Sequence, residues 1–218
     1  MIKILKGIVL ITLALASFQN LYAQEKYKED NFEIIEFKPE TGFPYKATLF
    51  PANSKHIVLL FPGGAFSMES WYGLAGKFQQ KGIAAISVGA RSYNNVKSTL
   101  KYLRDKKYEK FSVIGASLGG GSVTDVLSKE DTQGIIKLVA LAPYGGSSIN
   151  NQKIDKLFIV ANKDSFGIYN SVLKLFQDSS NPKYFYKIDS KKHAQHLFTT
   201  EHKDAIEKRI IEFVMDVK

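Results

Sequence analysis

A serine flanked by glycines follows an apolar run near the middle of the chain. The residues are Gly115-Ala116-Ser117-Leu118-Gly119, and they come directly after Phe111-Ser112-Val113-Ile114. Glycines two positions before and after a serine let neighbouring backbone come close in a sharp strand-to-helix turn, which exposes the hydroxyl at a sheet edge. An apolar stripe at helical spacing follows over residues 123–127 and places the hydroxyl near the positive end of a helix. We therefore predict that Ser117 is a nucleophile; the alternative is an ordinary serine in a glycine-rich turn.

The elements that must position this serine can be read from the alternation of apolar runs and helix-period stretches. The apolar runs are continuous, which is typical of strands buried on both faces of a parallel sheet. We expect strands at Glu33–Phe37, Lys46–Phe50, Ile57–Phe61, Ala84–Val88, Phe111–Ile114, Lys137–Leu141, Leu157–Val160 and Tyr184–Ile188. We expect helices at Trp71–Gln80, around residues 96–103, 123–127 and 168–176, and over Glu201–Val217. The predicted fold class is α/β, a three-layer sandwich around a mostly parallel, doubly wound sheet of about seven or eight strands.

Residues that directly follow strands matter most in this architecture, because ligands of such sheets bind beyond the carboxyl ends of the strands. Over most of the chain, the strand pattern and the glycine-flanked serine resemble the α/β-hydrolase superfamily, in which the nucleophile is followed along the chain by an acid and then a histidine. The resemblance implies that Asp164, which follows the strand at Leu157–Val160, is the acid. Asp189 and Asp178 are the alternatives, and Asp164 could instead cap a helix that begins near Ser165.

The same resemblance implies that His193, in the loop after Tyr184–Ile188, is the general base. His196 is the alternative, since residues three positions apart can share a helical face. His56 precedes its strand and so would lie at the wrong end of the sheet for catalysis. A metal site at His193 and His196 lacks an evident third ligand, so we predict no metal. The implied mechanism needs no organic cofactor either.

Two backbone N–H groups should face the oxyanion of the reaction. The resemblance implies that one belongs to Leu118, directly after the nucleophile. The other would come from the loop Phe61-Pro62-Gly63-Gly64-Ala65-Phe66, which is similar to the family's His-Gly-Gly-Gly loop. Pro62 stands where the family often has histidine, and Ala65 replaces the last glycine. Either Gly64 or Ala65 is therefore the second expected donor.

The N-terminus is typical of a secretory signal peptide. Lys3 and Lys6 precede a nearly continuous apolar stretch, Gly7–Phe18, which is too short to span a bilayer comfortably. Cleavage after Ala23 would leave residues 24–218 as a single α/β domain; cleavage after Ala16 and a retained anchor are the alternatives. We therefore expect a secreted or periplasmic protein with no membrane span after removal of the signal.

Composition narrows the remaining function classes. The 218 residues contain no cysteine, which excludes a disulfide scaffold, a thiolate zinc site and a cysteine nucleophile. The formal net charge of +9 could suggest a nucleic acid partner, but the lysines are scattered and form no basic stripe. Two of the 30 basic residues also belong to the predicted signal. We therefore interpret the charge as a solvated surface and predict no nucleic acid partner.

These features together predict an extracytoplasmic serine hydrolase that cleaves carboxylic esters through an acyl-enzyme. The interval between Ser117 and Asp164 is too short for a large cap domain, so we expect an open site for a small or surface-bound ester. Side chains that could line the site are Phe66, Met68, Trp71 and Tyr144, and those that could favour an acidic substrate are Lys163, Lys191 and Lys192. A peptidase or amidase with the same triad, or a non-catalytic binding module of this fold, are the alternatives.

Overall fold

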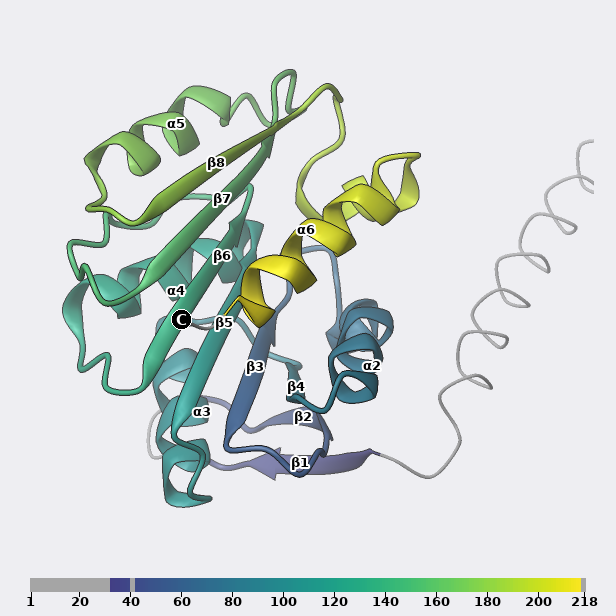
Figure 1. The fold of residues 1–218 in the computed structure, drawn as a ribbon, viewed down its shortest axis with the longest axis vertical. Helices are drawn as coiled ribbons and strands as arrows, with labels where there is room; N and C mark the ends of the chain where they lie inside the picture. Colours follow the sequence, from purple (N-terminus) through teal and green to yellow (C-terminus); the bar gives the residue numbers. More distant parts are fainter. Residues whose placement is uncertain (1–31, 40–41, 217–218) are drawn as a thin grey trace, which may run out of the picture. The chain divides into compact units, whose positions relative to one another are not determined.

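The structure, a computed structural model, describes residues 32–39 and 42–216 (Figure 1). The predicted signal peptide and both predicted cleavage sites lie outside these residues. Within the described part of the chain, no helix has the length and apolar character needed to cross a membrane.

The strands of residues 33–188 form one eight-stranded sheet. Its strands are β1 (Glu33–Phe37), β2 (Tyr45–Phe50), β3 (His56–Phe61), β4 (Ala84–Val88), β5 (Lys110–Ala116), β6 (Ile135–Leu141), β7 (Asp155–Ala161) and β8 (Lys183–Ile188). The spatial order is β1-β2-β4-β3-β5-β6-β7-β8. The pairings β1–β2 and β2–β4 are antiparallel, and all the others are parallel. The predicted mostly parallel, doubly wound sheet is confirmed, with β5 at the point where the strand order changes direction along the chain.

Helices cover both faces of the sheet. They are α2 (Tyr72–Gln80), α3 (Tyr93–Asp105), α4 (Ser117–Lys129), α5 (Tyr169–Asp178) and α6 (Lys203–Met215), with the short 3₁₀ helices η1 (Met68–Trp71) and η2 (Ala194–Thr199). Apolar side chains of α2 and α6 belong to one buried cluster, and those of α3 and α4 belong to another. Figure 1 shows α6 in front of the sheet and α3 and α4 behind it. The result is the predicted three-layer sandwich.

The central strand β3 begins with His56 and is apolar over its other five residues. All six of its residues are buried. Val58 and Leu60 belong to the cluster with α2 and α6, whereas Ile57, Leu59 and Phe61 belong to the cluster with α3 and α4. Since successive side chains of a strand point to opposite faces, the cover on both sides accounts for the continuous apolar run over residues 57–61.

A buried lysine secures the end of the sheet opposite to Ser117. Lys156 on β7 is fully buried, and its Nζ donates hydrogen bonds to the carbonyl oxygens of Asn151, Ile154 and Ser180 at 2.8–3.0 Å. Burial lowers the pKa of Lys156 to about 8. The three carbonyl groups offset the cost of removing the ammonium group from water, and the lysine ties the segment before β7 to the one before β8.

A buried histidine at the same end should make stability depend on pH. His56 Nε2 lies 2.8 Å from Ser112 Oγ across β3 and β5. Burial, with Lys110 and Lys137 nearby, lowers the pKa of His56 from 6.5 to about 4. Between these two pH values the unfolded chain binds a proton that the folded chain does not. The contribution of His56 to stability is therefore complete above pH 6.5 and is lost as the pH falls to 4.

We expect this loss to reach about 3 kcal/mol of unfolding free energy for the single group. Urea unfolding at several pH values between 7 and 4 measures it, with His56→Gln as the comparison because glutamine does not titrate. The variant should lose less stability over this interval than the wild type. Equal losses in the two proteins would show that His56 does not titrate as described.

Candidate active site

Ser117 lies at the junction of β5 and α4, in the sharp turn that its flanking glycines predict. Its φ is +47°, in the left-handed region. A Cβ atom on Gly115 would come within 2.7 Å of the Gly120 Cα, and one on Gly119 within 2.6 Å of the Pro62 carbonyl oxygen. Glycine is therefore required at both positions by close backbone contacts. The turn holds the half-buried Ser117 side chain at the carboxyl end of the sheet.

The structure brings Ser117 together with the predicted base and acid. His193 Nε2 lies 2.8 Å from Ser117 Oγ, and His193 Nδ1 lies 2.9 Å from Asp164 Oδ2. Asp164 follows β7 and His193 follows β8, and both side chains are buried. In this geometry a neutral imidazole donates its Nδ1–H to the carboxylate and accepts the serine O–H at Nε2. The three residues can therefore pass a proton from the serine to the imidazole.

Asp164 does not cap a helix, contrary to the alternative interpretation. Helix α5 begins at Tyr169, and its N-cap residue is Ile168. Asp164 Oδ1 instead accepts a hydrogen bond from the Phe166 N–H at 2.9 Å, and the Asp164 carbonyl accepts one from Gly167 N–H at 2.8 Å. A tight turn after β7 therefore orients the carboxylate towards the histidine.

The alternative acids and base have other partners. Asp189 is exposed and accepts hydrogen bonds from Asn162 Nδ2 at 2.9 Å and Lys163 Nζ at 3.1 Å. The hydrogen bond from Asn162 and, to a smaller extent, the one from Lys163 lower the pKa of Asp189. Asp178 ends α5 and pairs with Lys174 at 2.9 Å. His196 is exposed with its ring 4.8 Å from that of Phe66. Within residues 32–39 and 42–216, no three His, Cys, Asp or Glu side chains could hold a metal ion.

The loop after β3 lies against Ser117, as the predicted oxyanion loop should. A Cβ on Gly63 would lie 3.2 Å from the Ser117 Cβ, and one on Gly64 would lie 3.0 Å from Leu118 Cδ1. The Gly63 N–H is already engaged, because it donates to Gln195 Oε1 at 2.7 Å. Gly64 and Ala65 are exposed beside Leu118. That the N–H groups of Leu118, Gly64 and Ala65 face the oxyanion stays a prediction. Gly63 is not a further candidate for this role, because its N–H is already engaged.

Arg91 also holds this loop, and sequence reasoning missed it. Its Nη1 donates to the Gly64 carbonyl at 2.7 Å and its Nη2 to the Phe66 carbonyl at 2.9 Å. Within the loop, the Phe66 N–H donates to the Gly63 carbonyl at 3.1 Å. Arg91 comes shortly after the carboxyl end of β4, and its position there is the only sequence signal that could have drawn attention to it.

Exposed apolar side chains surround Ser117. The Phe166 ring is 63% exposed and its centroid lies 4.4 Å from that of His193. Leu118 is 46% exposed and Tyr144 52% exposed. Of the four side chains expected to line the site, Trp71 does not, because it is 1% exposed in the core, where it packs edge-on against Phe198. Phe166 was not predicted, because nothing in its local pattern distinguishes it from a core residue.

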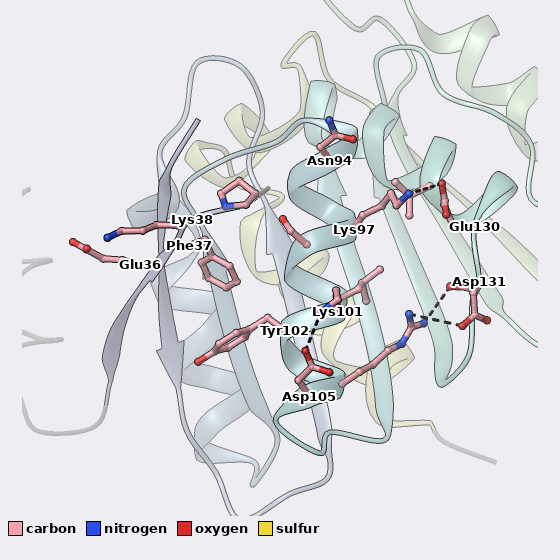
Figure 2. A pocket seen from close by; sticks show the side chains of 15 residues that line it. Glu36, Phe37, Lys38, Asn94, Lys97, Lys101, Tyr102, Asp105, Glu130 and Asp131 are labelled. Carbon is pink, nitrogen blue, oxygen red and sulfur yellow. Dashed lines mark hydrogen bonds and ion pairs between the residues drawn. The ribbon is translucent and has the colours of Figure 1, made fainter. Parts of the chain in front are cut away.

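A groove of about 610 Å³ lies elsewhere, along α3 and between the end of β1 and the end of α4. Three of its four basic side chains have acidic partners: Lys97 with Glu130 at 2.9 Å, Lys101 with Asp105 at 3.4 Å, and Arg104 with Asp131 at 3.9 Å. Figure 2 shows Lys97 pointing towards Glu130 and Lys101 towards Asp105. Ser117 does not line this groove, and the paired charges give it no excess of either sign for a ligand.

Comparison with solved structures identifies the fold. The alpha/beta hydrolase GrgF from Penicillium sp. sh18 superposes with a TM-score of 0.71 at 13% identity, covering 85% of this chain and 98% of that one. A dienelactone hydrolase from Anabaena variabilis gives 0.67 at 16% identity, covering 85% and 98%. An esterase from Pyrococcus furiosus gives 0.65 at 15% identity, covering 84% and 93%. The chain has the α/β-hydrolase fold. No protein-family model and no curated protein sequence matches the chain.

The α/β-hydrolase fold is present here without a cap between the serine and the acid. Only α4, β6 and β7 lie in the fully described interval from Ser117 to Asp164, together with their connecting loops. The predicted lack of a cap domain therefore holds for this interval. The connection from β6 to β7, residues 142–154, contains no helix.

Proposed function

We propose that this protein is a serine hydrolase that cleaves carboxylic esters through an acyl-enzyme intermediate. The observation that carries the proposal is the continuous hydrogen-bonded chain from Ser117 Oγ to His193 and on to Asp164, at 2.8 and 2.9 Å. The chain lies at the carboxyl edge of an α/β-hydrolase fold, where ligands of such sheets bind. Esterases and hydrolases among the similar structures support the same reaction class.

In the proposed acylation step, Ser117 Oγ bonds to the ester carbonyl carbon while His193 Nε2 takes the serine proton. Asp164 holds the Nδ1–H tautomer and stabilises the imidazolium that forms. The N–H groups of Leu118 and of Gly64 or Ala65 stabilise the negative oxygen, and removing one such donor typically costs about 3–4 kcal/mol of transition-state stabilisation. The C–O bond to the alcohol then breaks, and the alcohol leaves with the proton from His193.

Water completes the proposed cycle. His193 Nε2 takes a proton from a water molecule as the water oxygen attacks the acyl carbon. The bond to Ser117 Oγ breaks and the serine recovers its proton from His193, which releases the carboxylic acid. These steps use only the groups of this chain, the ester and water.

The surroundings of Ser117 favour an apolar acyl group. Leu118 at the start of α4, and Tyr144 and Phe166 in the connections after β6 and β7, are exposed, and each can lose apolar surface to a substrate at a gain of about 25 cal/mol per Å². Lys163, predicted to favour acidic substrates, is already paired with Asp189 at 3.1 Å. An amide or peptide substrate of the same machinery is the second candidate, since the triad geometry serves both.

A substrate series tests the proposal. The purified protein is assayed with p-nitrophenyl acetate, butyrate, octanoate and laurate, and with the matching anilides. We expect turnover of the esters, a rise in kcat/KM from acetate to a longer chain, and slower or no turnover of the anilides. A fluorophosphonate probe, followed by peptide mapping, should place the label on Ser117. Preferential anilide turnover would favour the amidase, whereas neither turnover nor labelling would leave a binding module of this fold.

We also propose that the enzyme acts outside the cytoplasm, in the periplasm or after secretion. The basic and apolar pattern of residues 3–18 supports this location. N-terminal sequencing of the exported protein should begin at Gln24, and recovery of only the full-length chain in the cytosol would contradict it.

A further inference from the structure

A buried glutamine connects the loop that bears His193 to the loop after β3. Gln195 is 2% exposed and lies two residues after His193. Its Oε1 accepts the Gly63 N–H at 2.7 Å, and its Nε2 donates to Ser70 Oγ at 2.7 Å. Gly63 precedes Gln195 by 132 residues, so the contact joins two distant parts of the chain.

The two contacts allow only one orientation of the carboxamide. The Ser70 O–H donates to the Ser67 carbonyl at 2.6 Å, so the Ser70 oxygen is left to accept. A rotated carboxamide would place its NH₂ against the Gly63 N–H and its oxygen against the Ser70 oxygen, which loses both hydrogen bonds. The side chain therefore presents a fixed acceptor to Gly63.

This acceptor lies close to the nucleophile. A Cβ on Gly63 would be 3.2 Å from the Ser117 Cβ and 3.4 Å from Gln195 Oε1, so one glycine separates the carboxamide from the serine. The backbone next to Gln195, between His193 and His196, is also tightly turned. Ala194 has a φ of +45°, and the His196 N–H donates to the His193 carbonyl at 2.9 Å. Gln195 and His193 thus belong to one short, constrained turn.

We propose that Gln195 is a positioning residue for the proposed ester hydrolysis. It fixes the loop Pro62–Phe66 in register with His193, so that the base and the backbone N–H groups of that loop address the same substrate carbonyl. The inference rests on the proposed function. Arg91 holds two carbonyl groups of the same loop, and the Phe66 ring contacts that of His196, but Gln195 supplies a side-chain hydrogen bond between the loop backbone and the turn that carries the base.

Gln195→Met is the main test, because methionine has a similar volume and offers no strong acceptor to Gly63. We expect kcat for p-nitrophenyl butyrate to fall by roughly 10- to 100-fold with KM within about twofold, since a misplacement of about 1 Å is enough for such a loss. Gln80→Met, at an exposed position at the end of α2, is the matched control and should retain wild-type kinetics.

A thionoester of the same alcohol gives a readout that a merely structural defect would not change. Its sulfur accepts hydrogen bonds poorly, so an aligned oxyanion hole favours the oxygen ester over it. The ratio of kcat/KM for the oxygen ester to that for the thionoester should fall in Gln195→Met and stay unchanged in Gln80→Met. A folded Gln195→Met with wild-type kcat and wild-type ratio overturns the inference.

Gln195→Glu covers the case in which the methionine variant does not fold. It keeps an acceptor for the Gly63 N–H and adds a negative charge near His193, which favours the imidazolium. We expect the midpoint of the pH–kcat profile to rise, and an unchanged kcat and midpoint overturn the inference. If the wild type cleaves no ester and takes no label at Ser117, the proposed function fails. Hydrogen exchange of the Gly63 N–H then still shows whether Gln195 holds the loop, because exchange should be faster in folded Gln195→Met, which loses the acceptor, than in Gln195→Glu, which keeps one.

Discussion

Ser117→Ala should lower kcat/KM for ester hydrolysis by roughly 10⁴- to 10⁶-fold and abolish labelling by a fluorophosphonate probe. The substitution removes the oxygen that His193 Nε2 contacts at 2.8 Å. Serine and alanine both carry a Cβ, so the left-handed φ of +47° strains the two residues alike. The fold should therefore persist, with an unfolding free energy within about 1 kcal/mol of the wild type.

Kinetics, probe labelling and urea unfolding of the same preparation measure these three expectations. Ser122→Ala is the matched control, because Ser122 is half-buried on the same helix, one turn beyond the nucleophile. It should keep wild-type activity and labelling. Equal labelling of Ser117→Ala and the wild type would remove Ser117 as the nucleophile, and a mapped label on another serine would replace it.

The fold was predictable because each strand of its centre has a self-contained pattern. The β4 bounds agree with the predicted strand, and β3 differs from its prediction by one residue. β5 and β7 extend further than predicted, since Gly115, Ala116 and Asp155 lack the β-branched apolar side chains on which the strand pattern depends. These residues are in strands because residues of the neighbouring strand β6 pair with all three of them, a tertiary effect that a local pattern does not contain.

The candidate site was predictable where chain order and strand ends define it. Ser117, Asp164 and His193 each follow the carboxyl end of a strand, and the parallel sheet brings those ends together. Gln195 and Phe166 could not be inferred in the same way. Their roles depend on side chains meeting across loops, and loop conformation follows neither of the two periodicities that mark helices and strands. Trp71 shows the converse error. It was expected to line the site, but it lies in the core, where it packs against Phe198, a residue far along the chain.

Asp164→Asn is the second substitution with a large expected effect, and its reason lies in the Phe166 N–H. Asp164 Oδ1 accepts that N–H at 2.9 Å and lies 3.1 Å from His193 Nδ1, whereas Oδ2 lies closer to the same nitrogen, at 2.9 Å. An asparagine would keep its oxygen on Phe166 and so turn its NH₂ towards Nδ1. The imidazole would then carry its proton at Nε2, where it cannot accept the proton of Ser117. We expect kcat to fall by roughly 10⁴-fold, because the tautomer is wrong although the geometry is intact.

Asp189→Asn makes this expectation specific to one carboxylate. Asp189 is the alternative acid from the sequence, and it is exposed with Asn162 and Lys163 as its partners. The exchange of oxygen for NH₂ is the same in both variants, so general effects of the substitution cancel in the comparison. Steady-state kinetics should show Asp189→Asn within about twofold of the wild type, while Asp164→Asn retains the fold and the substrate KM. The opposite ranking of the two variants would transfer the role of the acid to Asp189, and the hydrogen bond between Asp164 and His193 would then serve structure alone.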